Sequence, residues 1–403
     1  MKKFKKNIPF GYPLIDKKER NEINNVLNGH IYAHGPRTKK FEEEFCKYTK
    51  APHSISVSSC TAGMHLVYKN LNISNGDEVI VPAQTHVATA HAVEHAGAKP
   101  VFVDCDPKTG NIDPNKIEKK ITKKTKAILV PNLIGNIPDL KRISHIAKKY
   151  KIKVIEDSAD TLGAKIGKFS TGYFSDISIT SFYGSHVISC AGNGGMFMTN
   201  NKKIFEKAKI LRSWGRMSSL LKASENIKKR LNIKLKGFNY DKKFVFSEVG
   251  YNFEPSEIGA SFGLVQLKKF KKFSKIRKIN FNKHILFFKK YPNLFITPRL
   301  IQNVNTNFLA YPIIIKKNKY FDRKKLQIHL EKNNVQTRPI FSGNLLRHPA
   351  FEGIISKRNS LNSFKNSDYI MKNGILVGCH QGLSLKNIEY IHYKILKLIS
   401  KKK

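Results

Sequence analysis

The amino-acid sequence predicts an α/β protein built on a mainly parallel sheet with helices on both faces. Three short apolar runs, at residues 99–103, 126–130 and 153–155, are expected to form buried strands. Residues 139–150 lie between the last two runs and space their apolar side chains as an amphipathic helix does. Strands that alternate with helices are typical of a parallel sheet whose connections cover both of its faces.

Length and composition indicate more than one core. The chain has 403 residues, of which 40% are hydrophobic, and this is enough for a large domain and a smaller one. We expect a large domain over residues 1–270, with a polar and basic surface insertion near 205–246, and a small C-terminal domain over 271–403. From about residue 275 the composition becomes more basic and aromatic, which marks the change of domain.

Several classes of protein are excluded by the composition. No run of about eighteen apolar residues occurs, so we expect no membrane-spanning helix. The basic first six residues lack the apolar stretch of a secretory signal. The five cysteines show no CxxC spacing, which predicts neither a zinc site nor a disulfide framework. We therefore expect a cytoplasmic protein without a metal site and without a membrane partner.

The formal net charge of +44 raises the question of a nucleic-acid partner. The lysines are spread along the whole chain among many Asn and Ile residues, a pattern that A+T-rich codon usage also produces. No helix-turn-helix, zinc-finger or RNA-recognition signature accompanies the charge, and charge alone supplies only non-specific affinity. We expect no nucleic-acid partner.

The N-terminal part is expected to begin with two helices, at residues 16–27 and 38–48, the first of them capped by Asp16. Residues 55–66 then run from a strand through a turn of small residues into a helix. Such a turn presents backbone N–H groups at a helix N-terminus, where a phosphate is stabilised. An ordinary Ser/Thr helix cap is the alternative. His86, which follows the next strand, would on its own be a surface group.

Acidic residues follow the strand at 153–155, where Glu156-Asp157 is followed by Asp160. Open α/β sheets bind ligands at the carboxyl ends of their strands. The two aspartates are therefore candidate site residues, with a helix-capping role as the alternative.

A single imidazole, His186, lies on a short loop between two expected strands, at residues 177–182 and 196–198. A loop carried by a rigid sheet can fix the direction of one side chain. Further along the chain, helices are expected at 257–270 and 275–290, strands at 307–315, 335–339 and 375–382, and a helix at the C-terminal end.

Four segments together resemble the fold-type I, pyridoxal-phosphate-dependent sugar aminotransferases of the DegT/StrS type. They are Ser181-Phe182-Tyr183 with the loop after it, Glu156-Asp157 with Asp160, Gly250-Tyr251-Asn252, and residues 337–351. The resemblance covers about residues 10–395. It implies a seven-stranded, mainly parallel sheet, a smaller α+β domain, and pyridoxal or pyridoxamine phosphate as the cofactor.

His186 stands where most of that family has the lysine that binds the cofactor covalently. An imidazole cannot form this link, but it can transfer a proton near neutral pH. In the family a histidine here marks the sugar 3-dehydratase branch, so the resemblance implies that His186 is the catalytic residue. Some members of that branch bind an iron–sulfur cluster through four cysteines. Because such clusters need thiolates, no cluster is expected here, where the matching positions are Ala159, Ser218, Leu220 and Lys228.

The resemblance also assigns residues that would bind the cofactor and the substrate. The assigned residues are Thr61, Ala62, Ser181 and Asn252 around the cofactor phosphate, His86 against its ring, Asp157 at the ring nitrogen, Asp160 near the phenolic oxygen, and Arg338, Arg347 and His348 for the substrate. An arginine offers a planar fork of donors for phosphate or carboxylate. Asn252 would reach the phosphate of a neighbouring subunit, which implies a homodimer; a capping role is the alternative.

The activity that this resemblance implies is removal of the C3 hydroxyl from a nucleotide-diphospho-4-keto-6-deoxyhexose, with L-glutamate as the amino donor. Such a reaction belongs to the synthesis of dideoxysugars for surface polysaccharides. A conventional sugar aminotransferase and a non-catalytic protein that binds the cofactor or a nucleotide sugar are the alternatives. The sequence leaves the nucleotide and the sugar stereochemistry open.

Overall fold

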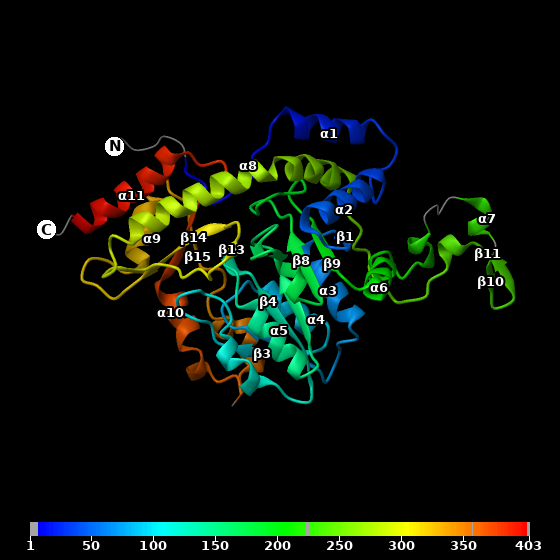
Figure 1. Cartoon of the computed structure of the whole chain (residues 1–403), viewed down its shortest axis with the longest axis horizontal. Helices are drawn as coiled ribbons and strands as arrows, with labels where there is room; N and C mark the ends of the chain where they lie inside the picture. Colours follow the sequence, from blue (N-terminus) through cyan, green and yellow to red (C-terminus); the bar gives the residue numbers. More distant parts are fainter. Residues whose placement is uncertain (1–6, 222–225, 232, 357, 401–403) are drawn as a thin grey trace.

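The structure, a computed structural model, describes residues 7–221, 226–231, 233–356 and 358–400; the basic first six residues lie outside this range. Its centre is a seven-stranded sheet of order β1-β9-β8-β5-β4-β2-β3, in which β9 runs antiparallel to both neighbours and the other pairs are parallel (Figure 1). The predicted seven-stranded, mainly parallel sheet is confirmed. Its strands are β1 (His53–Val57), β2 (Glu78–Pro82), β3 (Lys99–Val103), β4 (Thr125–Pro131), β5 (Lys153–Asp157), β8 (Ile177–Ser181) and β9 (Gly195–Thr199).

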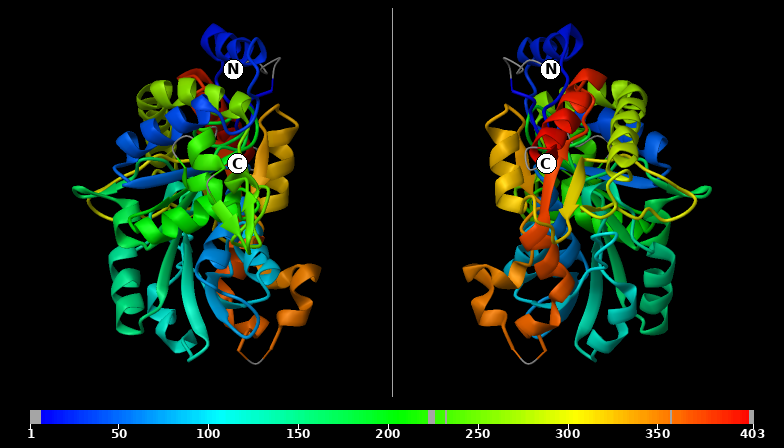
Figure 2. Two further views of the ribbon diagram at one scale, coloured as in Figure 1. Left: turned by 90° about the vertical axis from the view of Figure 1, so that its right-hand side faces the viewer. Right: turned by 90° about the vertical axis from the view of Figure 1, so that its left-hand side faces the viewer.

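Helices cover both faces of this sheet because successive side chains of a strand point to opposite sides. In β2, Val79 and Val81 join the apolar cluster of α3 and α4, whereas Ile80 joins the cluster of α5 on the other face (Figure 2). All three side chains are fully buried. The helices around this sheet are α2 (Pro36–Thr49), α3 (Cys60–Asn70), α4 (Ala88–His95), α5 (Leu140–Lys149) and α6 (Lys202–Arg212).

One continuous helix, α8 (Glu257–Phe288), runs from the large sheet to the small domain (Figure 1). The prediction of two separate helices in this region was wrong. Phe270, Phe273 and Arg277 are buried at helical spacing, so the inward-facing side of the helix continues through the lysines between them. The expected domain boundary at residue 270 falls inside this helix. None of the described helices combines the length and the apolar character that crossing a membrane requires.

The small domain is a four-stranded antiparallel sheet of order β12-β14-β16-β15. Helices α8, α9 and α11 pack on one face and α10 on the other. The start of the described chain joins this core, since Ile8 forms a parallel bridge with Val335 and lies in the same apolar cluster. The elements are β12 (Phe295–Ile296), β14 (Ala310–Ile315), β15 (Thr337–Pro339), β16 (Gly374–Gly378), α9 (Arg323–Glu331), α10 (Lys365–Asn373) and α11 (Leu385–Ser400); α1 (Lys17–Leu27) lies along α8.

The expected surface insertion at 205–246 needs a correction at its beginning. Residues 205–212 belong to α6, which packs on β1 and α3, and the side chain of Arg212 is fully buried. Its guanidinium donates to Glu42 Oε1 and to the carbonyl oxygen of Ser56, each over 2.8 Å. Beyond residue 212 the chain extends away from the sheet (Figure 1). This arm holds α7 (Ile227–Arg230), β10 (Ile233–Leu235) and β11 (Phe238–Tyr240).

The first residue of α8 caps the first turn of α2. The carboxylate of Glu257, 1% exposed, accepts hydrogen bonds from the backbone N–H groups of Gly35, Arg37 and Thr38 over 2.8–2.9 Å, and from the Thr38 hydroxyl over 2.6 Å. A negative charge at this position satisfies otherwise unpaired donors and interacts favourably with the helix dipole. One side chain therefore joins the two helices that pack against the His186 loop.

Replacing Glu257 with Ala should lower the free energy of unfolding by about 2–4 kcal/mol, because buried N–H groups lose a charged acceptor. Urea denaturation monitored by circular dichroism measures this loss. Glu43→Ala, an exposed substitution on the same helix α2, is the control and should stay within about 0.5 kcal/mol of the parent. Equal effects of the two substitutions would contradict the capping role.

Two histidines bond to each other between α8 and α11. His284 Nδ1 and His392 Nε2 are 3.0 Å apart, and the His392 ring stacks on Phe287 with ring centres 4.0 Å apart. One ring must donate and the other accept, so both cannot be protonated. Burial lowers the pKa of His284 to about 4. Burial, together with repulsion from His284, lowers the pKa of His392 to about 2.

Because these pKa values lie below the value of about 6.5 in the unfolded chain, the unfolded state binds more protons below that pH. The stabilisation is complete above pH 6.5 and is lost as the pH falls toward the folded-state pKa. The parent protein should therefore be more stable at pH 7 than at pH 5. In His392→Phe this gain in the free energy of unfolding should be smaller by roughly 1–2 kcal/mol. The exposed control His30→Gln should keep the parent difference; an unchanged difference in His392→Phe would refute the argument.

Candidate active site

A cavity of about 710 Å³ lies between the carboxyl ends of the large-sheet strands and the small domain. It brings together seven of the predicted site residues. They are Thr61, His86, Asp157, Asp160, Ser181, His186 and Arg338. They come from segments up to 277 positions apart, counted from Thr61 to Arg338. The tertiary structure alone therefore assembles the site.

His186 is held by the burial of the residues after it. Val187 and Ile188, each 2% exposed, pack in the apolar cluster formed with α2 and α8. The His186 side chain is 15% exposed, and its Nδ1 is buried without a hydrogen-bond partner, 3.9 Å from Asp160 Oδ1. Burial, with the charge of Arg277 nearby, lowers the pKa of this imidazole to about 4. The ring is therefore neutral at pH 7 and has a nitrogen free to accept a proton.

Asp157 is the last residue of β5, Asp160 lies three residues further on, and both line the same cavity. Asp157 Oδ1 accepts from the N–H of Ala159 over 2.9 Å, and Asp160 Oδ2 accepts from the N–H of Ile134 over 2.8 Å. Burial raises the pKa of Asp157 to about 6 and that of Asp160 to about 8, the latter also through repulsion from Asp157. In Asp157, Asp160 and His186 alike, the pKa shift favours the neutral form of the side chain.

The wall beside Asp157 is the N-terminus of α3. Ser59 caps this helix and accepts from the N–H of Ala62 over 3.0 Å, so the amide of Ala62 is already bonded within the chain. Cys60 and Thr61 line the cavity at the first turn. The Cys60 thiol lies 3.9 Å from Asp157 Oδ1, a contact that the sequence did not predict.

Three predicted site residues besides Ala62 lie outside the cavity lining. Arg347 forms a bidentate ion pair with Asp368, with Nε–Oδ1 at 3.0 Å and Nη2–Oδ2 at 2.5 Å. His348 Nε2 lies 2.6 Å from the carbonyl oxygen of Ser342. Asn252 is exposed. The structure therefore brings neither Arg347 nor His348 to the substrate cavity, because each is bonded to a group of its own domain.

Arg277 is a residue of the site that sequence reasoning missed. Its fully buried guanidinium donates to the carbonyl oxygens of His186 (3.3 Å), Phe308 (2.9 Å) and Leu309 (3.1 Å), and to Gln381 Oε1 (2.6 Å). Burial lowers its pKa to about 10, so it stays charged at neutral pH. In the sequence, Arg277 continues the helical spacing of the buried residues of α8. The many lysines around it made this spacing hard to recognise.

The cavity fits a pyridoxal phosphate. Asp157 is a buried carboxylate that a protonated ring nitrogen would neutralise, and the first turn of α3 suits a phosphate. His186 lines the same cavity, and its Nδ1 is buried without a hydrogen-bond partner. The described residues include no group of three His, Cys, Asp or Glu side chains placed to hold a metal ion. Sheet and site together define a fold-type I pyridoxal-phosphate enzyme.

The chain belongs to the DegT/DnrJ/EryC1/StrS aminotransferase family, whose sequence profile matches residues 13–396. It is 29% identical to the GDP-4-keto-6-deoxy-D-mannose 3-dehydratase of Escherichia coli O55:H7, over 97% of this chain and 100% of the relative. It is 31% identical to the GDP-perosamine synthase of Escherichia coli O157:H7, over 83% of this chain and 85% of the relative.

A solved structure of a GDP-4-keto-6-deoxymannose-3-dehydratase with a trapped PLP–glutamate geminal diamine matches with a TM-score of 0.85. Its sequence is 27% identical, and the match covers 96% of this chain and 100% of that one. The family, the fold type and pyridoxal phosphate as the cofactor are thereby confirmed. Relatives of both reaction types occur at similar identity, so similarity alone does not choose between dehydration and amino transfer.

Replacing Arg277 with Lys should lower the free energy of unfolding by about 2–4 kcal/mol, since one ammonium cannot reach acceptors on three segments. Urea denaturation of the cofactor-loaded protein measures this. Lys275→Ala, an exposed change on the same helix, is the control and should have little effect. If Arg277→Lys is as stable as the control, the carbonyl contacts do not stabilise the fold.

Proposed function

We propose that the protein removes the C3 hydroxyl from a nucleotide-diphospho-4-keto-6-deoxyhexose, using pyridoxamine phosphate and L-glutamate. The observation that carries this proposal is the side chain at position 186. An imidazole lies there, and no lysine is found among the described residues that line the cavity. Amino transfer in this family relies on a lysine amine in the cavity, whereas dehydration needs a group that moves a proton.

The chain's own residues supply the acid–base chemistry of this proposal. When bound, the cofactor supplies an amine for the sugar ketone and an electron sink. Neutral His186 accepts a proton through its free ring nitrogen and can return it to the departing hydroxyl. Asp157 would stabilise the positive charge on the ring nitrogen of the cofactor. Arg338, which lines the cavity near the small domain, would bind the diphosphate of the substrate.

A homodimer is part of the proposal. Asn252 is exposed in the single chain and does not line that chain's own cavity. We assign it, on the family resemblance, to the cofactor phosphate of a second subunit. Thr61 and Ser181 would bind that phosphate from within the subunit, and His86 would lie against the ring.

The reaction products distinguish the proposal from its alternatives. Cofactor-loaded protein is incubated with L-glutamate and GDP-, CDP-, dTDP- or UDP-linked 4-keto-6-deoxy sugars, beginning with GDP-4-keto-6-deoxymannose, the sugar in the name of the dehydratase relatives. Dehydration yields a sugar that has lost one oxygen atom, together with ammonia and 2-oxoglutarate. An amino sugar without free ammonia would indicate an aminotransferase, and no product with any sugar would indicate a binding protein.

His186→Asn should reduce the deoxygenation rate by about 10²- to 10⁴-fold, the usual contribution of a general acid–base group. Retention of cofactor through dialysis, measured by absorbance, should be unchanged, because the substitution leaves Asp157 and the first turn of α3 in place. His145→Asn, an exposed change on α5, is the matched control. Near-normal turnover of His186→Asn would mean that another group moves the proton.

A further inference from the structure

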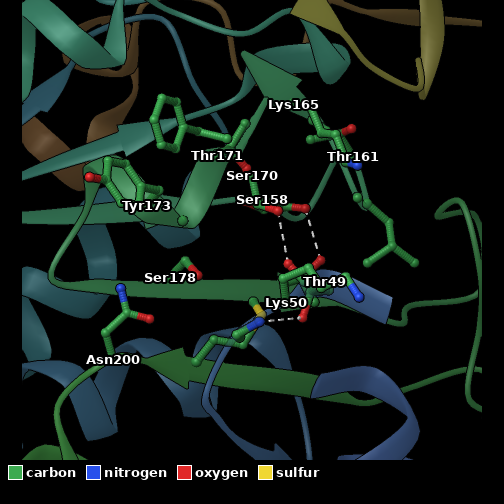
Figure 3. A pocket seen from close by; sticks show the side chains of 18 of the residues that line it. Thr49, Lys50, Ser158, Thr161, Lys165, Ser170, Thr171, Tyr173, Ser178 and Asn200 are labelled. Atoms are coloured by element: carbon green, nitrogen blue, oxygen red, sulfur yellow. Dashed lines mark hydrogen bonds between the residues drawn. The ribbon is translucent and has the colours of Figure 1, made fainter. Parts of the chain in front are cut away.

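A second cavity, of about 360 Å³, shares no lining residue with the active-site cavity. Ser158 and Thr161, from the segment that follows β5, are among the side chains that line it (Figure 3). The C-terminal end of α2, strands β8 and β9, and the hairpin of β6 (Lys165–Ile166) and β7 (Phe169–Ser170) enclose it. Residues at the end of β5 and just after it divide between the two cavities. Asp157, Ala159 and Asp160 line the active-site cavity, whereas Ser158 and Thr161 line the second cavity.

The floor of the second cavity offers hydrogen-bond acceptors. Its hydroxyl groups use their hydrogens within the protein: Thr180 donates to the carbonyl oxygen of Ser158 (2.8 Å), Ser170 to that of Thr49 (2.9 Å), and Ser158 to Glu156 Oε1 (2.6 Å). Ser158 Oγ also accepts from Asn132 Nδ2 over 3.2 Å, so the oxygens of Thr180 and Ser170 are the better acceptors for a ligand. A ligand with several O–H groups can donate hydrogen bonds to these acceptors, whereas an apolar ligand cannot.

Ser178 adds a hydroxyl that neither donates nor accepts a hydrogen bond among the described residues. This residue is 6% exposed. Ser178 on β8 and Asn200, just after β9, extend toward the space that Tyr173 flanks (Figure 3). Because the Ser178 hydroxyl is not fully enclosed by the protein, water or a ligand in the cavity can bond to it.

The rim of the cavity combines positive charge with aromatic rings. Lys50, Lys165 and Lys168 are exposed lining residues, and none of them forms an ion pair with a described carboxylate. Tyr173, 60% exposed, stacks on Phe169 with ring centres 4.4 Å apart. The acid on the lining, Asp176, is paired with Lys153 over 2.8 Å.

We propose that this cavity is a second binding site, for a sugar phosphate. The acceptor floor would bind the sugar hydroxyls, the exposed ring of Tyr173 would cover an apolar sugar face, and the rim lysines would bind the phosphate. A bare phosphate offers no donors to the floor, and an apolar ligand leaves the lysines and hydroxyls unused. The volume is within the range of small-molecule sites. The site is separate from the active-site cavity, so the proposal does not depend on the proposed reaction.

Calorimetric titration of the cofactor-loaded protein with glucose 1-phosphate, glucose and inorganic phosphate tests the proposal. Glucose 1-phosphate should bind saturably and more tightly than either of the other two. Lys165→Gln with Lys168→Gln should weaken its binding at least about tenfold, since charge-assisted bonds are lost, and Tyr173→Ala should weaken it as well. The matched controls, Lys123→Gln with Lys124→Gln and Tyr150→Ala, change exposed residues elsewhere and should bind as the parent does.

Three results would overturn the proposal. The first is no saturable binding of glucose 1-phosphate. The second is binding that Arg338→Ala abolishes and the rim substitutions leave unchanged, which would place the ligand in the active-site cavity. The third is equal affinity for inorganic phosphate, which would remove the role of the sugar. Because the readout is binding, its failure is distinguishable from absence of sugar dehydration.

Discussion

The buried guanidinium of Arg277 is the interaction on which the geometry of the site depends. It gathers carbonyl oxygens from the His186 loop and from the segment before β14, together with the side chain of Gln381 after β16. A buried charge is tolerated only where hydrogen bonds compensate for lost hydration. These segments are therefore held together around one side chain, and the His186 loop is fixed relative to the small domain that lines the cavity.

Burial sets the protonation states of the cavity before any ligand is considered. It lowers the pKa of His186 to about 4 and raises those of Asp157 and Asp160 to about 6 and 8. At pH 7 the His186 imidazole is therefore neutral, Asp157 is mostly ionised and Asp160 is mostly protonated. A positive charge placed beside Asp160 would favour its ionised form.

The segment after β5 divides the space above the sheet into two cavities. Two aspartates at the start of this segment line the active-site cavity, whereas Ser158 and Thr161 line the second cavity. Strand β8 shows the same division, since Ile177 and Ile179 join an apolar cluster while Ser178 and Thr180 line the second cavity.

The sequence by itself determined the strands of the large sheet, because apolar periodicity is a local signal, and its short motifs, through their resemblance to a family, indicated the seven side chains that meet in the cavity. It did not determine helix α6, whose beginning it assigned to a surface insertion. It did not determine that α8 is continuous, that Arg212 and Arg277 are buried, or that Arg347 and His348 point elsewhere. Each of these depends on partners distant in the chain: Arg277 bonds to His186, and Arg347 to Asp368. In a chain with 73 Lys and Arg residues, a basic side chain has the same local pattern whether it is solvated or buried. Only the tertiary structure, by placing acceptors around some of these side chains, decided which of them support the site.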